Sequence, residues 1–365
     1  MKAVVVMRTN DILRVQNFSE IDLNDHFFDS LKDNYDDFRD WFGRKQESGA
    51  SAYIARDNNG RVTAFLYLKL EDDLDTSFDP FLAGRRIKIG TFKVDPSHRG
   101  TGLGKRLLAI ALRRFVEDSE NLGFIYVTLY ERVARDIDDL EKTLLRFGFF
   151  KAGNKGNEVV LEKFKPDNGK YDIVSGFPFV KTDLASKYLL PIAPEYHKRM
   201  FSESRLATER SLTPADNTPF NNVEKIYLSG NSNAINLHRN DLVVVYRMTD
   251  IQGSAYFRSV VSTVGTVEEI TNISDFDNYD MFVSYLKGQS IFADSELENL
   301  WHSQRYPWVI RFLYNFSFKK YPTRQMLIDN NVIDTERRIG IDRLSDTQFD
   351  RILELGDVSE NYFVN

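Results

Sequence analysis

Residues 94–105 form a glycine-rich, basic segment whose composition suits it to bind an anion. The segment reads Val-Asp-Pro-Ser-His-Arg-Gly-Thr-Gly-Leu-Gly-Lys. Gly100, Gly102 and Gly104 lack side chains, so an anion can approach the backbone closely. Where a helix begins, unpaired N–H groups and the helix dipole also attract negative charge. The segment therefore predicts a pyrophosphate-binding loop.

Two better-known phosphate loops do not fit this spacing. A Walker A loop requires a glycine five residues before the Gly-Lys pair and a serine or threonine after the lysine, but those positions hold Arg99 and Arg106. A Rossmann fingerprint that starts at Gly100 requires its third glycine at the position of Lys105. Neither loop accounts for the segment.

The sequence places this loop between a strand and a helix. Residues 86–94 alternate apolar and polar side chains, and the strand ends before Pro96 because proline has no N–H to donate to a sheet. From residue 103 to residue 116, apolar residues recur at helical spacing, which predicts an amphipathic helix. Three arginines lie between those apolar positions: Arg106, Arg113 and Arg114.

The motif resembles the acetyl-coenzyme A motif of the GNAT superfamily of N-acetyltransferases. Val94-x-Pro96-x-x-Arg99 leads directly into Arg99-x-x-Gly102-x-Gly104. This resemblance implies acetyl-coenzyme A (acetyl-CoA) as the cofactor and an amine as the acetyl acceptor.

The order of elements in residues 1–165 is similar to the same family. Hydrophobic patterning predicts a strand, two helices, three strands, a helix, a strand, a helix and a final strand. The second of the long helices ends at Gly148-Phe149, like the penultimate helix of the family. We therefore expect a mixed α/β sheet domain over residues 1–165.

The resemblance also implies roles for backbone groups. In this superfamily a backbone N–H of the strand before the motif supports the acetyl carbonyl, which implies Phe92, Lys93 or Val94 here. Backbone N–H groups of the motif hold the pyrophosphate, which implies Arg99, Gly100, Thr101, Gly102, Leu103, Gly104 and Lys105. The side chains of Arg99 and Lys105 add positive charge at the same place.

The general acid and the general base are harder to assign. The family commonly uses a tyrosine four residues before the glycine of Gly-Phe as the acid, but this chain has Leu144 there. Tyr130, at the end of a predicted strand over residues 124–130, is our substitute candidate for the catalytic acid, and a half-buried edge aromatic is the competing interpretation. Four carboxylates compete as base without distinguishing spacing: Glu71, Asp72, Asp73 and Glu131.

The C-terminal half has a different composition. Residues 166–220 are rich in proline and glycine and are expected to form a connector. From residue 221 to 365 strands dominate, and the run Asn240-Asp241-Leu242-Val243-x-x-Tyr246-Arg247, followed by a long bent strand, resembles the PUA-like barrels of the ASCH and EVE branches. The expected fold is therefore α+β: the GNAT sheet followed by a small PUA-like β-barrel with helices.

Relatives of PUA-like barrels often bind RNA or modified bases, and one local pattern agrees. Between residues 299 and 328 no acidic residue occurs, and cations alternate with aromatic residues, which is typical of surfaces that bind nucleic acid. The candidate nucleic-acid contacts are Arg305, Arg311, Lys319, Lys320 and Arg324. In a strand, however, the alternating Trp308, Ile310, Phe312 and Tyr314 also fit a buried core.

Composition excludes several kinds of site. The chain has 365 residues, a formal net charge of −6 and no cysteine, so disulfides, thiolate nucleophiles and cysteine-based zinc sites are excluded. The five histidines show no metal-ligand spacing, and no metal site is expected. No apolar run is long enough for a membrane span, and we expect a cytoplasmic protein, with a dimer plausible.

The sequence is compatible with three functions. The leading prediction is an acetyl-CoA-dependent N-acetyltransferase acting on an RNA-associated amine, such as an aminoacyl-tRNA or a nucleobase. The second is acetylation of proteins or small amines, with the C-terminal domain as a docking module. The third is a non-catalytic regulator that senses coenzyme A and binds nucleic acid.

Overall fold

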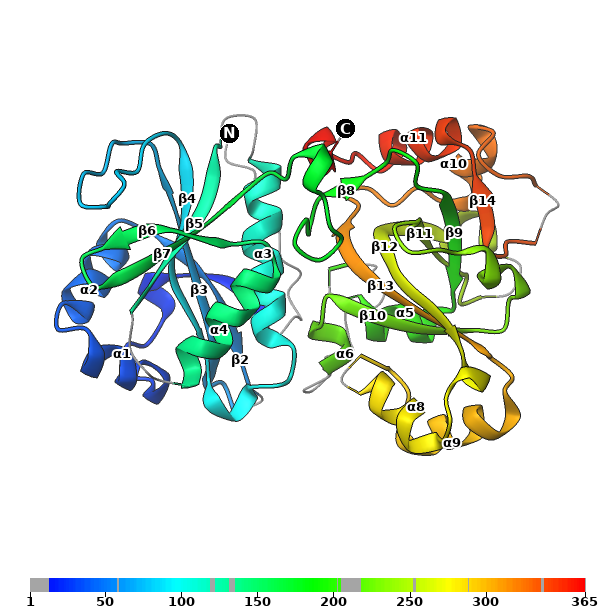
Figure 1. Ribbon diagram of the computed structural model, residues 1–365, viewed down its shortest axis with the longest axis horizontal. Helices are drawn as coiled ribbons and strands as arrows, with labels where there is room; N and C mark the ends of the chain where they lie inside the picture. The colour runs from blue at the N-terminus through cyan, green and yellow to red at the C-terminus, as the bar shows by residue number, and fades with distance from the viewer. Residues whose placement is uncertain are drawn as a thin grey trace.

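The computed structural model describes residues 13–57, 59–118, 122–130, 135–201, 203–204, 218–251, 254–287, 289–335 and 338–364. Two large sheets stand side by side, and a long helix, α3 (Leu103–Glu117), lies between them (Figure 1). The first sheet carries the glycine-rich loop, and the second is built from the C-terminal half of the chain.

The first sheet has seven strands in the order β1-β2-β3-β4-β5-β7-β6. Neighbouring strands are antiparallel except β4 and β5, which are parallel and are joined by α3 as a crossover. The strands are β1 (Leu13–Asn17), β2 (Ser51–Arg56), β3 (Val62–Glu71), β4 (Arg86–Val94), β5 (Phe124–Tyr130), β6 (Phe150–Lys155) and β7 (Glu158–Phe164).

The sequence predicts every strand of this sheet except β6. That strand holds two lysines, an asparagine and a glycine among its six residues, so it lacks a clear apolar alternation. It forms because a tight turn, with Gly156 at a φ of 57°, folds it back against β7. Pairing with a neighbour, rather than local pattern, determines this edge strand.

Helices cover both faces of the first sheet. α1 (Asp29–Asn34) and α2 (Phe38–Glu47) pack on one face through an aromatic cluster that includes Phe18 and Phe42. α3 and α4 (Arg135–Arg146) cover the opposite face, where the largest apolar cluster of the protein lies. The sheet is therefore buried on both sides.

The second sheet has six strands in the order β10-β13-β12-β11-β9-β14. Only β9 and β11 are parallel neighbours. The strands are β9 (Lys187–Ile192), β10 (Glu224–Ser229), β11 (Leu242–Arg247), β12 (Val260–Asn272), β13 (Trp308–Ser317) and β14 (Asp342–Leu344).

The predicted PUA-like β-barrel is not confirmed. Among the described residues, β10 and β14 are the two edges of the second sheet and do not pair with each other, so the sheet is open. The long bent strand is present as β12, and its register shifts beside Gly265, where a Cβ would lie 2.7 Å from the Leu313 carbonyl oxygen. The coarser expectation of a mixed α/β protein holds.

The segment expected to be a connector, residues 166–220, contributes to the second sheet. β9 from this segment pairs with both β11 and β14. α5 begins at Pro194, because the fixed φ of proline suits the first turn of a helix. The helices of the C-terminal half are α5 (Pro194–Met200), α6 (Thr218–Asn221), α7 (Ala255–Arg258), α8 (Tyr279–Leu286), α9 (Asp294–Ser303), α10 (Arg324–Asp329) and α11 (Asp346–Leu355).

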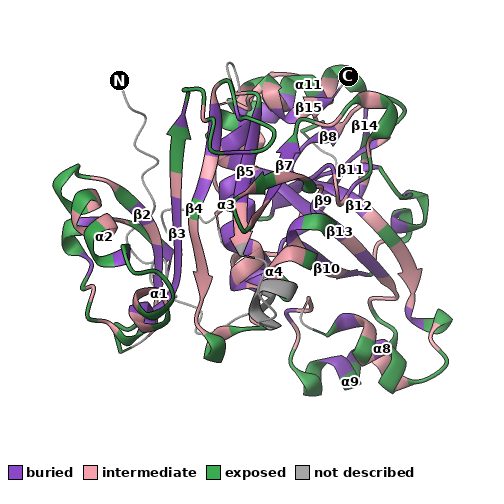
Figure 2. Cartoon of the chain, turned by 60° about the vertical axis from the view of Figure 1, so that its left-hand side comes forward, coloured by how far each residue is buried: buried purple, intermediate pink, exposed green. Residues whose placement is uncertain are grey.

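The α3 helix is buried over most of its surface. Eleven of its fifteen residues are buried, although an amphipathic surface helix buries only one stripe (Figure 2). One apolar cluster runs from the first sheet through α3 into the second sheet and includes Ile89, Leu108, Phe177, Val264 and Phe316. The two sheets therefore share one core around this helix.

The end of the chain returns to this shared core. β15 (Phe363–Val364) pairs with β8 (Val180–Lys181) in a separate two-stranded sheet. The Tyr362 hydroxyl lies 3.4 Å from a carboxylate oxygen of Glu117, the last residue of α3. None of the helices in the described ranges combines the length and the apolar character needed to cross a membrane.

One buried histidine gives the second sheet a pH-dependent stability. His197 on α5 is fully buried, and its Nε2 lies 2.8 Å from the Ser262 hydroxyl. Burial, assisted by the nearby Arg247 charge, lowers the pKa of His197 from 6.5 to about 3. Between these two values the unfolded chain binds a proton that the folded chain does not, so stability falls as the pH falls.

We predict that His197→Gln, whose amide can still reach Ser262, makes stability less sensitive to acid. Between pH 6 and pH 4, the free energy of unfolding of the wild type should fall by about 1.4 kcal/mol per pH unit more than that of the variant. Urea denaturation at several pH values measures both slopes. Equal slopes would contradict a neutral, buried His197.

Candidate active site

The strands β4 and β5 separate toward their carboxyl ends. They pair from Arg86 to Ile89 on β4 and from Phe124 to Val127 on β5, and in the described structure they make no further pairs with each other. A register shift against β3 leaves Gly90 as a bulge at the point of separation, and a Cβ there would lie 2.9 Å from the Tyr67 ring. The result is a gap between two strands of one sheet.

Two N–H groups of β4 face this gap. Asp95 donates its N–H to the Thr63 carbonyl on β3 at 2.8 Å. In an antiparallel pair of strands, residues that hydrogen-bond to the neighbour alternate with residues that do not, so this bond fixes which N–H groups of β4 point toward β3. By this alternation Lys93 pairs with β3, whereas Phe92 and Val94 direct their N–H groups away from β3 and toward β5. Of the three residues predicted to support an acetyl carbonyl, Phe92 and Val94 therefore have the suitable orientation.

The loop after β4 is held by its own polar groups. The Asp95 carboxylate accepts the Ser97 N–H at 2.9 Å and opens a short 3-10 turn, and the Thr101 hydroxyl donates to the His98 carbonyl at 2.7 Å. Gly100 and Gly102 have φ values of 78° and 77°, in the left-handed region that favours glycine. These two glycines turn the chain from the strand into α3.

The same loop leaves a row of N–H donors unused. The first N–H of the helix that bonds within α3 belongs to Arg106, which donates to the Gly102 carbonyl at 3.0 Å. None of the six preceding N–H groups, from residue 100 to residue 105, donates to any described residue. Six adjacent free donors at the positive end of a fifteen-residue helix have the geometry and the partial charge to accept an anion.

The three cations in or near the loop, Lys93, Arg99 and Lys105, point to different places. Lys93 points to the other face of the sheet, where its ammonium donates to the Phe27 carbonyl and to the Ser30 hydroxyl. Arg99 is exposed beside the loop. The Lys105 ammonium is paired with the carboxylate of Glu224, a residue of the second sheet.

The second sheet thus contacts the loop directly. The Glu224 carboxylate is buried and also pairs with Arg146 at the end of α4, so it joins α3 to α4. The Asn221 side-chain amide donates to the Thr101 carbonyl at 3.3 Å. Burial raises the pKa of Glu224, but the charges and hydrogen bonds of Lys105 and Arg146 outweigh burial, so its pKa lies below the usual value.

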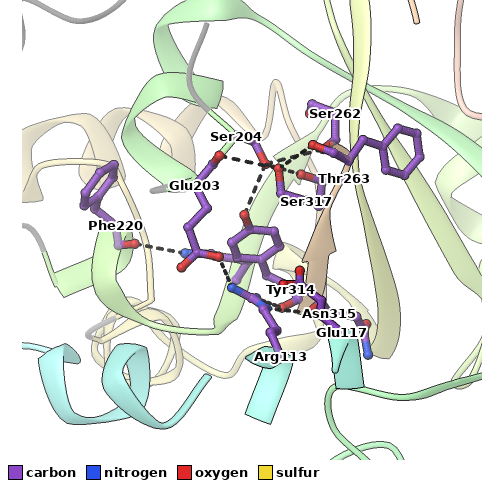
Figure 3. A network of polar contacts seen from close by, with 12 residues as sticks. Arg113, Glu117, Glu203, Ser204, Phe220, Ser262, Thr263, Tyr314, Asn315 and Ser317 are labelled. Atoms are coloured by element: carbon purple, nitrogen blue, oxygen red, sulfur yellow. Dashed lines mark hydrogen bonds and ion pairs between the residues drawn. The ribbon is translucent and has the colours of Figure 1, made fainter. Parts of the chain in front are cut away.

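Arg113 ties α3 to the centre of the second sheet (Figure 3). Its Nε donates to the Asn315 carbonyl at 2.7 Å, and its Nη2 donates to the Tyr314 carbonyl at 2.6 Å. Its guanidinium lies 4.3 Å from the centroid of the Tyr314 ring and pairs with the Glu203 carboxylate. A guanidinium can satisfy so many buried partners because its donors form a planar fork.

The structure supplies no proton donor at the family's usual position. Leu144 is fully buried in the apolar core, so this position cannot donate or accept a proton. Tyr130 ends β5, and its side chain lies outside the described part of the structure, so its proposed role as acid stays a prediction.

Among the predicted candidates for the base, Glu71 is already engaged. It accepts hydrogen bonds from Lys69 at 2.8 Å and from the Tyr126 hydroxyl at 2.7 Å, and it lies 3.3 Å from Arg86. Burial raises the pKa of Glu71, but the bonds from Lys69 and Tyr126 outweigh burial and lower it. A carboxylate held ionised in this way is a weak base. Asp72 and Asp73 are exposed, and Glu131 lies outside the described residues.

The five candidate nucleic-acid contacts are not brought together. Arg305 precedes β13 and Lys319 follows it, so about 30 Å of strand separates them. The alternating aromatic residues of β13, such as Phe312 and Tyr314, are buried in the core. The remaining cations have intramolecular partners: Arg311 lies 4.0 Å from the Tyr285 ring centroid, Lys320 lies 3.2 Å from Asp357, and Arg324 donates to the Thr335 carbonyl at 3.2 Å.

Sequence reasoning did not identify the residues of the C-terminal half that contact the loop and α3. Asn221, Glu224 and Glu203 are single polar residues in segments without a motif, and no spacing connects them to residues 94–105. They become functional candidates only through the packing of α3. In the described ranges no group of three or more His, Cys, Asp or Glu side chains could hold a metal ion.

We predict that Arg113→Met destabilises the whole protein by about 3 kcal/mol, because Glu203 and two buried carbonyls lose their donor. Arg114→Met is the matched control, since Arg114 makes only a partly exposed pair with Asp118 one turn along α3. The control should change stability by less than about 0.5 kcal/mol. Urea unfolding followed by far-ultraviolet circular dichroism measures both. Similar losses in the two variants would show that Arg113 does not join the two sheets.

Known proteins resemble this chain over parts of its length. No curated protein matches the sequence. Among solved structures, the protein PH1933 from Pyrococcus horikoshii OT3 is 20% identical, with 42% of this chain and 99% of that chain covered and a TM-score of 0.31. A GNAT-family acetyltransferase from Listeria monocytogenes 4b F2365 is 21% identical, with 42% and 94% covered and a TM-score of 0.32. A point mutant of the ZmASCH protein from Zymomonas mobilis is 8% identical, with 46% and 95% covered and a TM-score of 0.30.

A family model identifies part of the chain. Residues 15–137 match the Acetyltransferase (GNAT) family, and this segment contains β4, the glycine-rich loop and α3. Enzymes of this family use acetyl-CoA. The match supports a GNAT acetyltransferase domain at residues 15–137, with acetyl-CoA as its cofactor.

Proposed function

We propose that this protein is an N-acetyltransferase that transfers the acetyl group of acetyl-CoA to a primary amine. The observation that carries this proposal is the row of six unused N–H donors at residues 100–105, next to the gap between β4 and β5. The pyrophosphate of the coenzyme fits such a row of donors. The extended arm of the coenzyme, which carries the thioester, fits a gap whose edge offers further N–H groups.

The chain's own groups divide the work of the reaction. When bound, acetyl-CoA supplies an acetyl thioester, whose transfer forms an N–C bond, breaks the C–S bond and leaves a thiol. The N–H groups of residues 100–105 would hold the pyrophosphate, and those of Phe92 and Val94 would orient the arm and polarise the carbonyl. Lys105, neutralised by Glu224, would contribute little net charge, so backbone donors dominate.

Proton transfer must follow another route than the family's usual one. Because Leu144 has no proton to give, the departing thiolate must receive its proton from a different group or from water. Tyr130 stays our candidate for this step. The amine must lose a proton as well, and the engaged state of Glu71 makes direct abstraction by that residue unfavourable.

We predict that acetyl-CoA raises the melting temperature of the wild type and not that of Gly102→Glu. The new carboxylate brings bulk and negative charge into the row of donors. A ligand present at a hundred times its Kd stabilises the folded state by about 2.7 kcal/mol. Gly60→Glu is the matched control, because Gly60 also has a positive φ of 81° but lies in the exposed turn between β2 and β3.

The control separates backbone strain from loss of the site. Both variants place a glutamate at a positive φ, so both should melt below the wild type without ligand. Only Gly60→Glu should keep the response to acetyl-CoA. If acetyl-CoA raised the melting temperature of Gly102→Glu as much as that of the wild type, the loop would not be part of the binding site.

We predict that thiol release from acetyl-CoA requires an added amine. The protein contains no cysteine, so every thiol detected by a chromogenic disulfide comes from the coenzyme. Radiolabelled acetyl transfer to total tRNA, total protein and small amines then identifies the acceptor class. Transfer to tRNA would support the RNA-associated acceptor. Stabilisation by acetyl-CoA without any transfer would instead favour the non-catalytic, coenzyme A-sensing regulator.

A further inference from the structure

Three hydroxyl groups lie where β4 and β5 begin to separate. Thr128 is the first residue of β5 beyond its last pair with β4. On β4 the Gly90 bulge follows that pair, and the next residue, Thr91, lies directly opposite Tyr67 on β3. Thr91 and Tyr67 therefore stand on one side of the gap, and Thr128 stands on the other.

All three side chains are on the face of the sheet opposite α3. Tyr67 packs in the aromatic cluster of α1 and α2, whereas both of its neighbours along β3 pack against the core that surrounds α3. Thr91 shares the face of Tyr67, because residues directly opposite each other in neighbouring strands share a face. Val127 belongs to the core of α3, so the next residue, Thr128, points to the opposite face.

These hydroxyl groups have no partner within the described structure. The side-chain oxygens of Tyr67, Thr91 and Thr128 form no hydrogen bond there, and none of them is enclosed as a buried polar atom without a partner. All three oxygens are therefore open to a ligand. A Cβ at Gly90 would lie 2.9 Å from the Tyr67 ring, so the missing side chain at Gly90 lets this ring reach the edge of the gap.

The two faces of the gap differ in polarity. On the α3 face, Phe92, Val94 and Leu129 pack against the apolar core. An amine that enters from that face would lose water without gaining hydrogen-bond partners. On the opposite face the three hydroxyl oxygens can accept hydrogen bonds. The hydroxyl face is therefore the one that suits an amine.

The free N–H groups of β4 lead to the same place. Back along the chain from the row at residues 100–105, the next N–H groups directed toward β5 are those of Val94 and Phe92. Phe92 directly follows Thr91, and one residue of a strand spans about 3.3 Å. A carbonyl that accepts the Phe92 N–H is therefore close to the three hydroxyl groups.

Resting on the function proposed above, we propose that Tyr67, Thr91 and Thr128 form the acceptor subsite, and that it takes an unhindered primary amine. A neutral primary amine has two N–H donors and one lone pair. One N–H donates to the Tyr67 or Thr91 oxygen, and the other donates to the Thr128 oxygen across the gap, which directs the lone pair at the acetyl carbonyl.

The reaction then balances without a charged group in the subsite. The nitrogen forms the N–C bond, the C–S bond breaks and the sulfur leaves as a thiolate. The nitrogen passes one proton to water, and the thiolate takes one proton from water or from a protein group. A secondary amine has a single N–H, so it forgoes one of the two hydrogen bonds and is the poorer acceptor.

Three substitutions remove the hydroxyl groups and keep the shapes of the side chains: Tyr67→Phe, Thr91→Val and Thr128→Val, made singly and combined in a triple variant. Tyr53→Phe is the matched control, because Tyr53 is on the neighbouring strand β2 and packs on the α3 face. The melting temperature of each variant without ligand shows that it folds.

The first measurement does not depend on turnover. The probe is coenzyme A whose sulfur carries an N-ethylacetamide group, which places an amide N–H beyond the sulfur. Calorimetric titration should show that the wild type and Tyr53→Phe bind this conjugate more tightly than coenzyme A itself. In the triple variant this preference should fall about fivefold, which corresponds to about 1 kcal/mol for one hydrogen bond. Equal affinity of the wild type for the two ligands, or an unchanged preference in the triple variant, would overturn the subsite.

The second measurement compares ethylamine with N-methylethylamine as acetyl acceptors. The wild type should have the higher kcat/KM with ethylamine. The triple variant should lose about fivefold or more in kcat/KM with ethylamine and less with N-methylethylamine, and it should keep the wild-type Kd for acetyl-CoA. An undiminished preference for ethylamine in the triple variant would contradict recognition by hydroxyl groups, because it would reflect the bulk of the methyl group alone.

The two measurements separate this subsite from the proposed function. Acetyl transfer that proceeds equally well in the wild type and in the triple variant would overturn the subsite and leave the function standing. Binding of the conjugate that depends on the three hydroxyl groups, without acetyl transfer to any amine, would support the subsite and overturn the function.

Discussion

The burial of α3 between two sheets is the constraint on which the rest of the structure depends. Eleven of the fifteen residues of this helix are buried, including Arg106 and Arg113, whose charges need partners wherever they lie. The C-terminal half supplies them: Asn221 at the end of α6 for Arg106, and the carbonyls of β13 together with Glu203 for Arg113. Without the second sheet an apolar helix would be exposed and two buried arginines would lose their partners, so we expect the two sheets to unfold together.

The same constraint shapes the loop at the start of the helix. Because α3 is held along its length, its first turn has a fixed position, and the N–H groups of residues 100–105 remain free of internal partners among the described residues. A row of donors is useful for binding only if it does not rearrange when the anion arrives. Glu224 and Asn221 add to this rigidity, since they hold Lys105 and the Thr101 carbonyl from outside the first sheet.

The parts of the molecule that sequence could predict are those decided locally. Residues 86–116 encode a strand, a stop at Pro96, glycines for two positive φ values and a helical apolar pattern, and the structure confirms each element. The arginines of α3 were expected on a polar face, because nothing in the sequence shows that a second sheet covers it. β6 was missed because it lacks an apolar alternation and forms by pairing with β7, and the contacts of Glu224 were missed because no motif or spacing connects that residue to the loop. The cations before and after β13 are near one another in the sequence, which suggested a single surface, but about 30 Å of strand separates them in the structure.

Amide hydrogen exchange at residues 100–105, with and without acetyl-CoA, would show whether the free N–H groups of the loop bind the coenzyme. These N–H groups have no internal acceptor in the described structure, so they should exchange quickly in the free protein and slow markedly when the coenzyme is bound. The later turns of α3, already bonded and buried, should change little. Unchanged exchange at residues 100–105 under saturating acetyl-CoA, or protection that appears elsewhere instead, would show that these N–H groups do not bind the coenzyme.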